Sequence, residues 1–210
     1  IGSGLVFPLS EEDIMIEPIK IENHWPRIAA IDFGWDHPTA MVWCAVDNES
    51  ETFYIYDCYR ASKASPTVHA QNIRMRPHFI PIAYPHDGNR RDSMGNPGLA
   101  DQYRNLGCNF RLEHFTNPPA LGNNKGSNSI EEGLMAMLQK IEAGKFKVFN
   151  TLGDWFEEFR MYHRKDGKVV PLRDDLLSAT RYAFQSQRFA VAGEDPSWTA
   201  DVEYRNYGIV

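Results

Sequence analysis

Three strand-like segments joined by short connections most constrain how this chain can fold. Residues 27–32 form an apolar run that ends in a carboxylate, residues 40–46 are again apolar, and residues 52–59 are rich in aromatic and β-branched side chains. This composition is typical of β-strands. Because short connections join antiparallel neighbours, residues 27–59 predict an antiparallel meander.

Beyond the meander, the apolar periodicity alternates between helical and strand spacing. Helices are expected at residues 68–75, 99–106, 130–143, 154–162 and 174–189, with short strands at 79–84, 109–112 and 146–149 and a hairpin at 164–170. Residues 116–128 are rich in Asn, Gly and Pro and predict a loop. No apolar run approaches the roughly 20 residues that cross a bilayer, so we expect no membrane partner.

The formal charge is distributed unevenly along the chain. The whole chain carries −6, from 22 Lys and Arg against 28 Asp and Glu, but residues 1–25 contribute −4 and residues 191–210 contribute −3, which leaves +1 for residues 26–190. The acidic total therefore does not exclude a nucleic-acid partner, since bound cations would make the central field more positive. We expect three regions: an approach segment or linker (1–25), one globular domain (26–190) and an acidic C-terminal tail (191–210).

Carboxylates stand at the ends of apolar elements, where packing does not explain a charge. Asp32 ends the first strand, Asp87 follows a later strand, and Asp174 and Asp175 open the last helix. Carboxylates that converge in this way hold hard divalent cations, and two ions about 3.5–4 Å apart promote phosphodiester cleavage. Each also has an ordinary structural interpretation, as a turn residue or as a helix N-cap.

Two other kinds of site are excluded by the sequence. The three cysteines, Cys44, Cys58 and Cys108, lie in separate segments and lack zinc-site spacing. No G-x-x-x-x-G-K-[ST] motif occurs, so this chain carries no P-loop for ATP hydrolysis.

Four short motifs occur in a characteristic order. They are Gly-Leu-Val-Phe-Pro at residues 4–8, Ile-Asp-Phe-Gly at 31–34, Tyr-Pro-His-Asp-Gly at 84–88 and Arg-Asp-Asp-Leu-Leu-Ser-Ala at 173–179. In this order they resemble the nuclease domain of tailed-phage terminase large subunits, most closely those of headful-packaging short-tailed phages. The resemblance covers about residues 4–190 and implies an α/β fold of the ribonuclease H-like type, with a mixed central sheet and helices on both faces.

The resemblance also implies the residues of an acidic site. Asp32, Asp87 and Asp175 are the expected catalytic residues, and together with Asp174 they are the expected ligands of Mg²⁺ or Mn²⁺, with two ions bound. Within the adjacent pair we expect Asp175 to be the main ligand. Many relatives carry a further Asp where this chain has Ser178, so that carboxylate is missing here. His86, beside Asp87, is a candidate accessory residue.

Basic side chains in loops are candidates for contact with the DNA backbone. They are Arg90, Arg91, Lys125, Arg164, Lys165 and Lys168. Backbone contacts carry no direct sequence information, so we expect little sequence preference. Solvated loop charges are the alternative interpretation of these residues.

The carboxylate pattern predicts a metal-dependent enzyme. The resemblance implies the endonuclease domain of a viral genome-packaging terminase that cuts concatemeric double-stranded DNA by two-metal-ion hydrolysis, with little sequence preference. By resemblance, the expected partners are an ATPase domain of the same parent chain, a portal protein and a small terminase subunit, and the expected location is the host cell cytoplasm rather than the mature virion. Two alternatives stay open: a junction resolvase or recombinase nuclease, and a mainly non-catalytic module that docks onto a portal through the tail.

Overall fold

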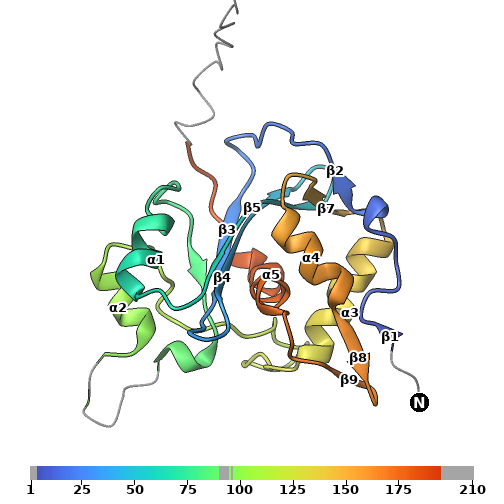
Figure 1. Ribbon diagram of the computed structural model, residues 1–210. Helices are drawn as coiled ribbons and strands as arrows, with labels where there is room; N and C mark the ends of the chain where they lie inside the picture. Colours follow the sequence, from blue (N-terminus) through green and yellow to red (C-terminus); the bar gives the residue numbers. More distant parts are fainter. Residues whose placement is uncertain (1–3, 90–94, 96, 195–210) are drawn as a thin grey trace, which may run out of the picture.

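A mixed sheet forms the centre of the molecule in the computed structural model, which describes residues 4–89, 95 and 97–194 (Figure 1). In these residues the sheet has six strands, ordered β2-β7-β5-β4-β3-β6. Their bounds are Met15–Ile16 (β2), Arg27–Asp32 (β3), Thr39–Asp47 (β4), Thr52–Ala61 (β5), Ile82–Ala83 (β6) and Phe146–Phe149 (β7). Strands β3, β4 and β5 pair antiparallel, which confirms the predicted meander. The pairs β2–β7, β5–β7 and β3–β6 are parallel.

Helices cover both faces of this sheet (Figure 1). One face carries α1 (Pro66–Ile73) and α2 (Leu99–Asn105), and the other carries α3 (Ile130–Glu142), α4 (Gly153–Met161) and α5 (Asp175–Gln185). The expected mixed sheet with helices on both faces is confirmed. Each helix in the described ranges is too short or too polar to span a bilayer.

The core has two halves, one on each side of the sheet. Ile28 and Ala30 of β3 pack with α3, α4 and α5, whereas Ala29 and Ile31 pack with α1 and α2. Successive side chains of a strand point to opposite faces, and both faces are covered here, so the strand reads as a continuous apolar run. Asp32 is the first residue of β3 to emerge from this core.

The expected approach segment contributes to the folded body. Strand β1 (Gly4–Leu5) pairs with β8 (His163–Lys165), which pairs in turn with β9 (Lys168–Val169), and β2 pairs with β7. Ile14 and Ile21 are fully buried. The role of residues 1–25 as a link to an ATPase domain stays a prediction.

Three predicted elements differ from the structure. The strand expected at 79–84 is reduced to β6, because Pro81 and Pro85 flank it and lack the N–H that a ladder needs. The strand expected at 109–112 is wrong: Phe110 forms only an isolated bridge with Ile82. The helix expected to reach Phe189 ends at Gln185, and the 3-10 turn η3 (Gln187–Phe189) follows it.

Candidate active site

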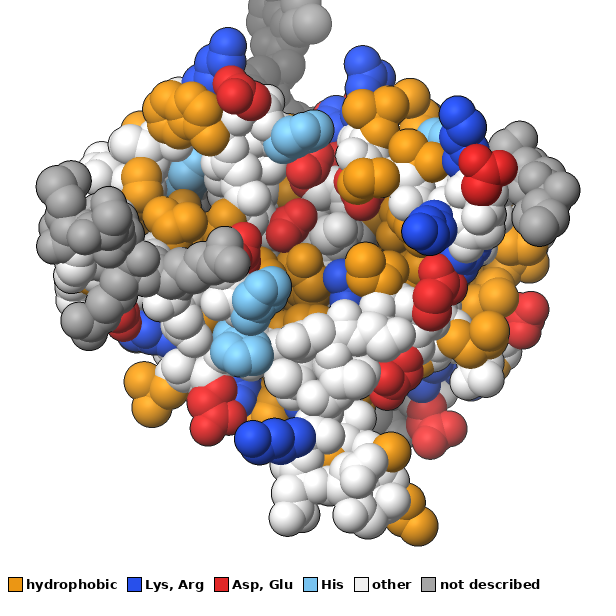
Figure 2. Space-filling model, turned by 90° about the horizontal axis from the view of Figure 1, so that it is seen from below, with side chains coloured by type: hydrophobic (Ala, Val, Ile, Leu, Met, Phe, Trp, Pro, Cys, Tyr) orange, Lys and Arg blue, Asp and Glu red, His pale blue; other side chains and the backbone are white. Residues whose placement is uncertain are grey.

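Four carboxylates meet at one end of the central sheet. Asp32 is the last residue of β3, Asp87 lies in the 3-10 turn η2 (His86–Asn89), and Asp174 and Asp175 stand where α5 begins. Since β6 runs parallel to β3, the residues that follow these two strands emerge at the same edge. Figure 2 shows this end of the molecule, where acidic side chains gather in a hollow. Asp87, Asp174 and Asp175 all lie near enough to act on the pKa of Asp32, so the four expected residues share this end of the sheet, and their roles as ligands stay a prediction.

Asp32 carries the strongest electrostatic perturbation of the cluster. Burial, followed by the negative charge of Asp175 and smaller effects of Asp174 and Asp87, raises the pKa of Asp32 to about 7. A hydrogen bond opposes this rise: the Tyr182 hydroxyl donates to Asp32 Oδ1 over 3.3 Å. Negative charge is thus concentrated around Asp32, and among the described residues no cation is a main contributor to its pKa, which is the pattern expected of a metal-binding carboxylate.

The two carboxylates at the start of α5 belong to the same electrostatic unit. Burial raises the pKa of both Asp174 and Asp175, and the charge of Asp175 raises that of Asp174 further. His37 has the opposite effect on both groups. Asp174 occupies the N-cap position, but its side chain makes no capping hydrogen bond within the described helix. Its carboxylate therefore stays available to the site.

The chemistry of these donors fits a hard divalent cation. Carboxylate oxygens are the ligands that Mg²⁺ and Mn²⁺ prefer. In the present side-chain positions, no three His, Cys, Asp or Glu residues of the described chain form a ready-made cage. Like charges repel one another in the absence of a cation, and a shared ion reverses that repulsion. We infer that ion binding would draw these carboxylates together.

Glu158 fixes the start of α5, although no motif in the sequence indicates this role. This fully buried residue of α4 accepts hydrogen bonds from the backbone N–H groups of Leu176 (2.7 Å) and Leu177 (3.3 Å) through Oε2. Its Oε1 pairs with Arg60 at 3.1 Å. A side chain from another helix thus satisfies N–H groups at the start of α5 and holds Asp175 in place. The available signal was a carboxylate on the apolar face that carries Trp155.

Some of the predicted DNA-contacting basic residues already have a partner, and others are exposed. Arg164 forms a two-bond ion pair with Glu131 of α3, at 2.6 and 2.7 Å, so this guanidinium already has a partner. Lys165 and Lys168 are exposed on the β8–β9 hairpin, and Lys125 is exposed in the 116–128 loop. Arg90 and Arg91 lie outside the described residues. Contact of these side chains with DNA stays a prediction.

Two hollows adjoin the acidic cluster. A cleft of about 540 Å³ is lined by Asp175, His37 and Arg60, among other residues. A cavity of about 190 Å³ is lined by His86, Arg181 and Tyr182, and the Tyr182 hydroxyl donates to Asp32. His86 is exposed, and its ring lies 6.4 Å from that of His114.

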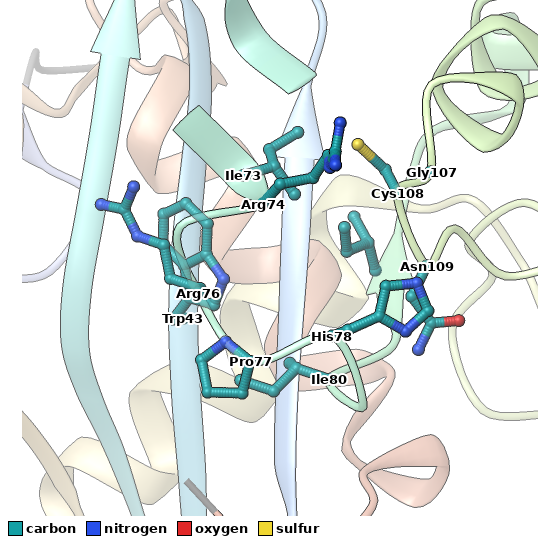
Figure 3. Close-up of a pocket in the computed structure, with 11 residues that line it drawn as sticks. Trp43, Ile73, Arg74, Arg76, Pro77, His78, Ile80, Gly107, Cys108 and Asn109 are labelled. Carbon is teal, nitrogen blue, oxygen red and sulfur yellow. The ribbon is translucent and has the colours of Figure 1, made fainter. Parts of the chain in front are cut away.

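A third cavity is unrelated to the carboxylates. It measures about 190 Å³ and lies between the segment that follows α1 and the segment that follows α2 (Figure 3). Trp43 and Ile80 line it, and the Arg76 guanidinium stands 4.3 Å from the centroid of the Trp43 ring. No Asp or Glu lines this cavity within the described chain, and we assign it no part in the site.

We expect the metal-free protein to lose about 1–2 kcal/mol of stability between pH 6.5 and 8. Burial raises the pKa of Asp32 and of Glu158 to about 7, above the ordinary values of 3.8 and 4.5. Below pH 7 the folded state therefore binds more protons than the unfolded state, and the free energy of unfolding falls as the pH rises through 7. Burial lowers the pKa of His69, which opposes this trend, but its effect fades as the pH rises above the ordinary 6.5.

Urea unfolding in EDTA, followed by circular dichroism at several pH values, measures this trend. Added Mn²⁺ should reverse it, because a bound cation favours ionised carboxylates. A stability that rises between pH 6.5 and 8 without metal would contradict the expectation.

Comparison with known proteins establishes the class of protein to which this chain belongs. Residues 29–187 match the family model described as the terminase RNaseH-like domain, and the chain belongs to that family. The ribonuclease H-like fold is thereby confirmed, as is the resemblance to terminase nuclease domains.

Individual terminase proteins resemble this chain over most of its length. The terminase large subunit of Salmonella phage P22 is 37% identical over 190 residues, which cover 90% of this chain and 37% of the relative. The chain thus spans little more than a third of that relative's length. The structure of the P22 large terminase nuclease domain matches with a TM-score of 0.81 and 36% identity, over 91% of this chain and 96% of the other. The nuclease domain of the SPP1 large terminase g2p, solved with bound Mn, shares the fold at a TM-score of 0.54 and 18% identity, over 81% and 93% of the two chains.

Proposed function

We propose that this chain is a divalent-metal-dependent endonuclease domain that cuts double-stranded DNA during viral genome packaging. The observation that carries the proposal is the meeting of Asp32, Asp87, Asp174 and Asp175 at one sheet edge, with the pKa of Asp32 raised to about 7. The manganese in the SPP1 nuclease domain supports a divalent cation for this fold.

The carboxylates of the cluster would hold Mg²⁺ or Mn²⁺, in two sites, with Asp175 as the main ligand of the α5 pair. When bound, such ions activate a water molecule and stabilise the leaving oxygen of a phosphodiester. The chain's own residues place the ligands: the end of β3 fixes Asp32, the Tyr182 hydroxyl orients its carboxylate, and Glu158 holds the start of α5. His86 and His37 lie beside the acidic residues and are suited to contact phosphate or water.

The whole-protein context is part of the same proposal. The P22 relative is much longer than this chain, which supports a parent protein with an additional ATPase domain. A portal protein and a small terminase subunit are the proposed assembly partners, and the host cytoplasm is the proposed location. Most of the acidic tail that we expect to face the portal, residues 195–210, lies outside the described part of the chain.

Supercoiled plasmid provides the direct test. With Mn²⁺ or Mg²⁺ the chain should convert it to nicked and then linear DNA, and EDTA should stop the reaction. Sequencing of the new ends should show scattered positions, because backbone contacts do not specify bases. Absence of cleavage with both metals would contradict the proposal, and strong preference for a four-way junction would instead favour a resolvase.

A further inference from the structure

Two arginines share one aromatic ring just beyond the C-terminal end of α5. The Cζ atoms of Arg111 and Arg188 lie 3.2 and 4.4 Å from the centroid of the Phe189 ring. Arg188 is anchored by hydrogen bonds from its guanidinium to the carbonyl oxygens of Gln185 and Thr116. Burial, and then the positive charge of Arg188, lower the pKa of Arg111. The fold therefore holds two like charges close together.

No carboxylate neutralises this pair within the described residues. Glu113 lies near Arg111 and favours its charged form, but neither arginine forms an ion pair in the part of the chain that the structure describes. The pair lines a groove of about 640 Å³, to which Lys125, His114 and Glu113 also contribute, so cationic side chains outnumber the single carboxylate there. Uncompensated cations that a fold holds together in a groove are suited to bind an anion.

The groove continues toward the acidic cluster. Asn128 lines both this groove and the adjoining cavity that contains His86, Arg181 and Tyr182. The Tyr182 hydroxyl contacts Asp32, so the cavity adjoins the cluster directly. On the face seen in Figure 2, histidine side chains lie between the acidic hollow and basic side chains.

A buried guanidinium, that of Arg181, also lines the connecting cavity. Arg181 is only 5% exposed, and its Nη1 atom is buried without a hydrogen-bond partner among the described residues. Gly133 of α3 leaves room for the aliphatic part of Arg181, because a Cβ at residue 133 would stand 2.8 Å from the Arg181 side chain. A buried guanidinium with an unpaired donor favours an anionic ligand at this place.

We propose that Arg111 and Arg188 bind the sugar–phosphate backbone of DNA away from the scissile bond, with Arg181 between them and the acidic cluster. The inference rests on the proposed nuclease function and adds a substrate-binding site to it. An acidic protein surface would also match the charge, but the continuity with the carboxylate cluster favours the nucleic acid. Phosphate contacts position a duplex without reading its sequence.

Duplex binding with chemistry blocked tests this site. Fluorescence anisotropy of a labelled 30-base-pair duplex in EDTA, at several salt concentrations, would compare wild type with Arg111→Ala/Arg188→Ala. We expect affinity to fall about 10-fold or more at low salt, and the slope of log affinity against log salt to become shallower by about one per arginine. The single variant Arg111→Gln, which removes no ion pair described in the structure, guards against misfolding of the double variant.

A matched control removes two charges at the opposite end of the sheet. Lys145 directly precedes β7, and Lys20 lies in the segment between β2 and β3, where it pairs with exposed Glu22. Lys20→Ala/Lys145→Ala should leave the salt slope close to that of wild type. If wild type cleaves plasmid and the arginine variants bind duplex like this control, the inference fails while the nuclease function stands. If wild type neither binds nor cleaves DNA, both fail. Unchanged duplex affinity with lost binding of polyglutamate would assign the groove to an acidic protein instead.

Discussion

The Asp32→Asn variant is expected to lose metal-dependent cleavage by at least about 100-fold, because it removes the carboxylate on which the charge of the cluster converges. Asp175, Asp174 and Asp87 all act on the pKa of Asp32. Asparagine keeps the shape and can still accept the hydrogen bond from the Tyr182 hydroxyl. The loss would therefore report on negative charge rather than on packing. Plasmid nicking rates in Mn²⁺ measure it.

The same substitution should stabilise the metal-free protein. Ionising a carboxyl whose pKa has moved from 3.8 to about 7 costs roughly 4 kcal/mol in the folded state. Asparagine avoids this cost, so we expect about 1–3 kcal/mol more stability than wild type at pH 8 in EDTA. Mn²⁺ should raise the melting temperature of wild type, and that of the variant much less.

Opposite effects on activity and stability separate a metal ligand from a structural turn residue. Asp13→Asn is the matched control, since Asp13 is exposed in the 3-10 turn η1 (Glu11–Asp13) and should change neither quantity appreciably. An Asp32→Asn variant that cleaves like wild type, or that is less stable than wild type without metal, would overturn the assignment of Asp32.

Glu158→Ala is expected to cost about 3–5 kcal/mol of stability and most of the cleavage activity. The substitution leaves the N–H groups of Leu176 and Leu177 without their acceptor, and it removes a buried partner of Arg60. Asp175 directly precedes Leu176, so the metal-binding end of α5 loses its support. Urea unfolding and plasmid nicking measure the two effects.

The neighbouring residue supplies the control. Glu157 also pairs with Arg60 but is 45% exposed, so solvent screens this pair, and Glu157→Ala should change stability little and leave cleavage nearly unchanged. Glu158→Gln keeps an oxygen acceptor toward α5 and should recover part of the stability. Equal effects of the Glu157 and Glu158 substitutions would show that Glu158 contributes only as one more partner of Arg60.

Local signals predicted much of the fold and the positions of the acidic residues. The apolar run that ends in Asp32 and the turn around Asp87 can both be predicted from neighbouring residues, and both occur in the structure. Strands β1 and β2 were missed because each has two residues and depends on a partner far along the chain. Glu158 was missed for a related reason, since the N–H groups that it accepts from lie 18 and 19 residues away.

Long-range contacts also determine which basic residues are already paired with a carboxylate. Arg164 was expected to be free for DNA, but the fold places Glu131 beside it. Arg111 and Arg188 were not singled out, because nothing near either residue in the sequence indicates that both meet at Phe189. Sequence patterns locate charges, whereas tertiary contacts decide which charges remain uncompensated.

Asp32 and Asp87 lie on different kinds of element, a strand and a turn, and such elements differ in the free energy needed to open them locally. Asp32 ends a strand whose preceding residues are buried and paired with β4 and, at Ala29 and Ala30, also with β6, and Asp32 itself pairs with Ala40, so it is anchored to the core. Asp87 belongs to a four-residue turn and can move by a local fluctuation. Of the proposed metal ligands, Asp32 is therefore held in place by the core, whereas Asp87 can change its position by a local movement of its turn. Substitutions in the turn can tune ion affinity at little expense to global stability.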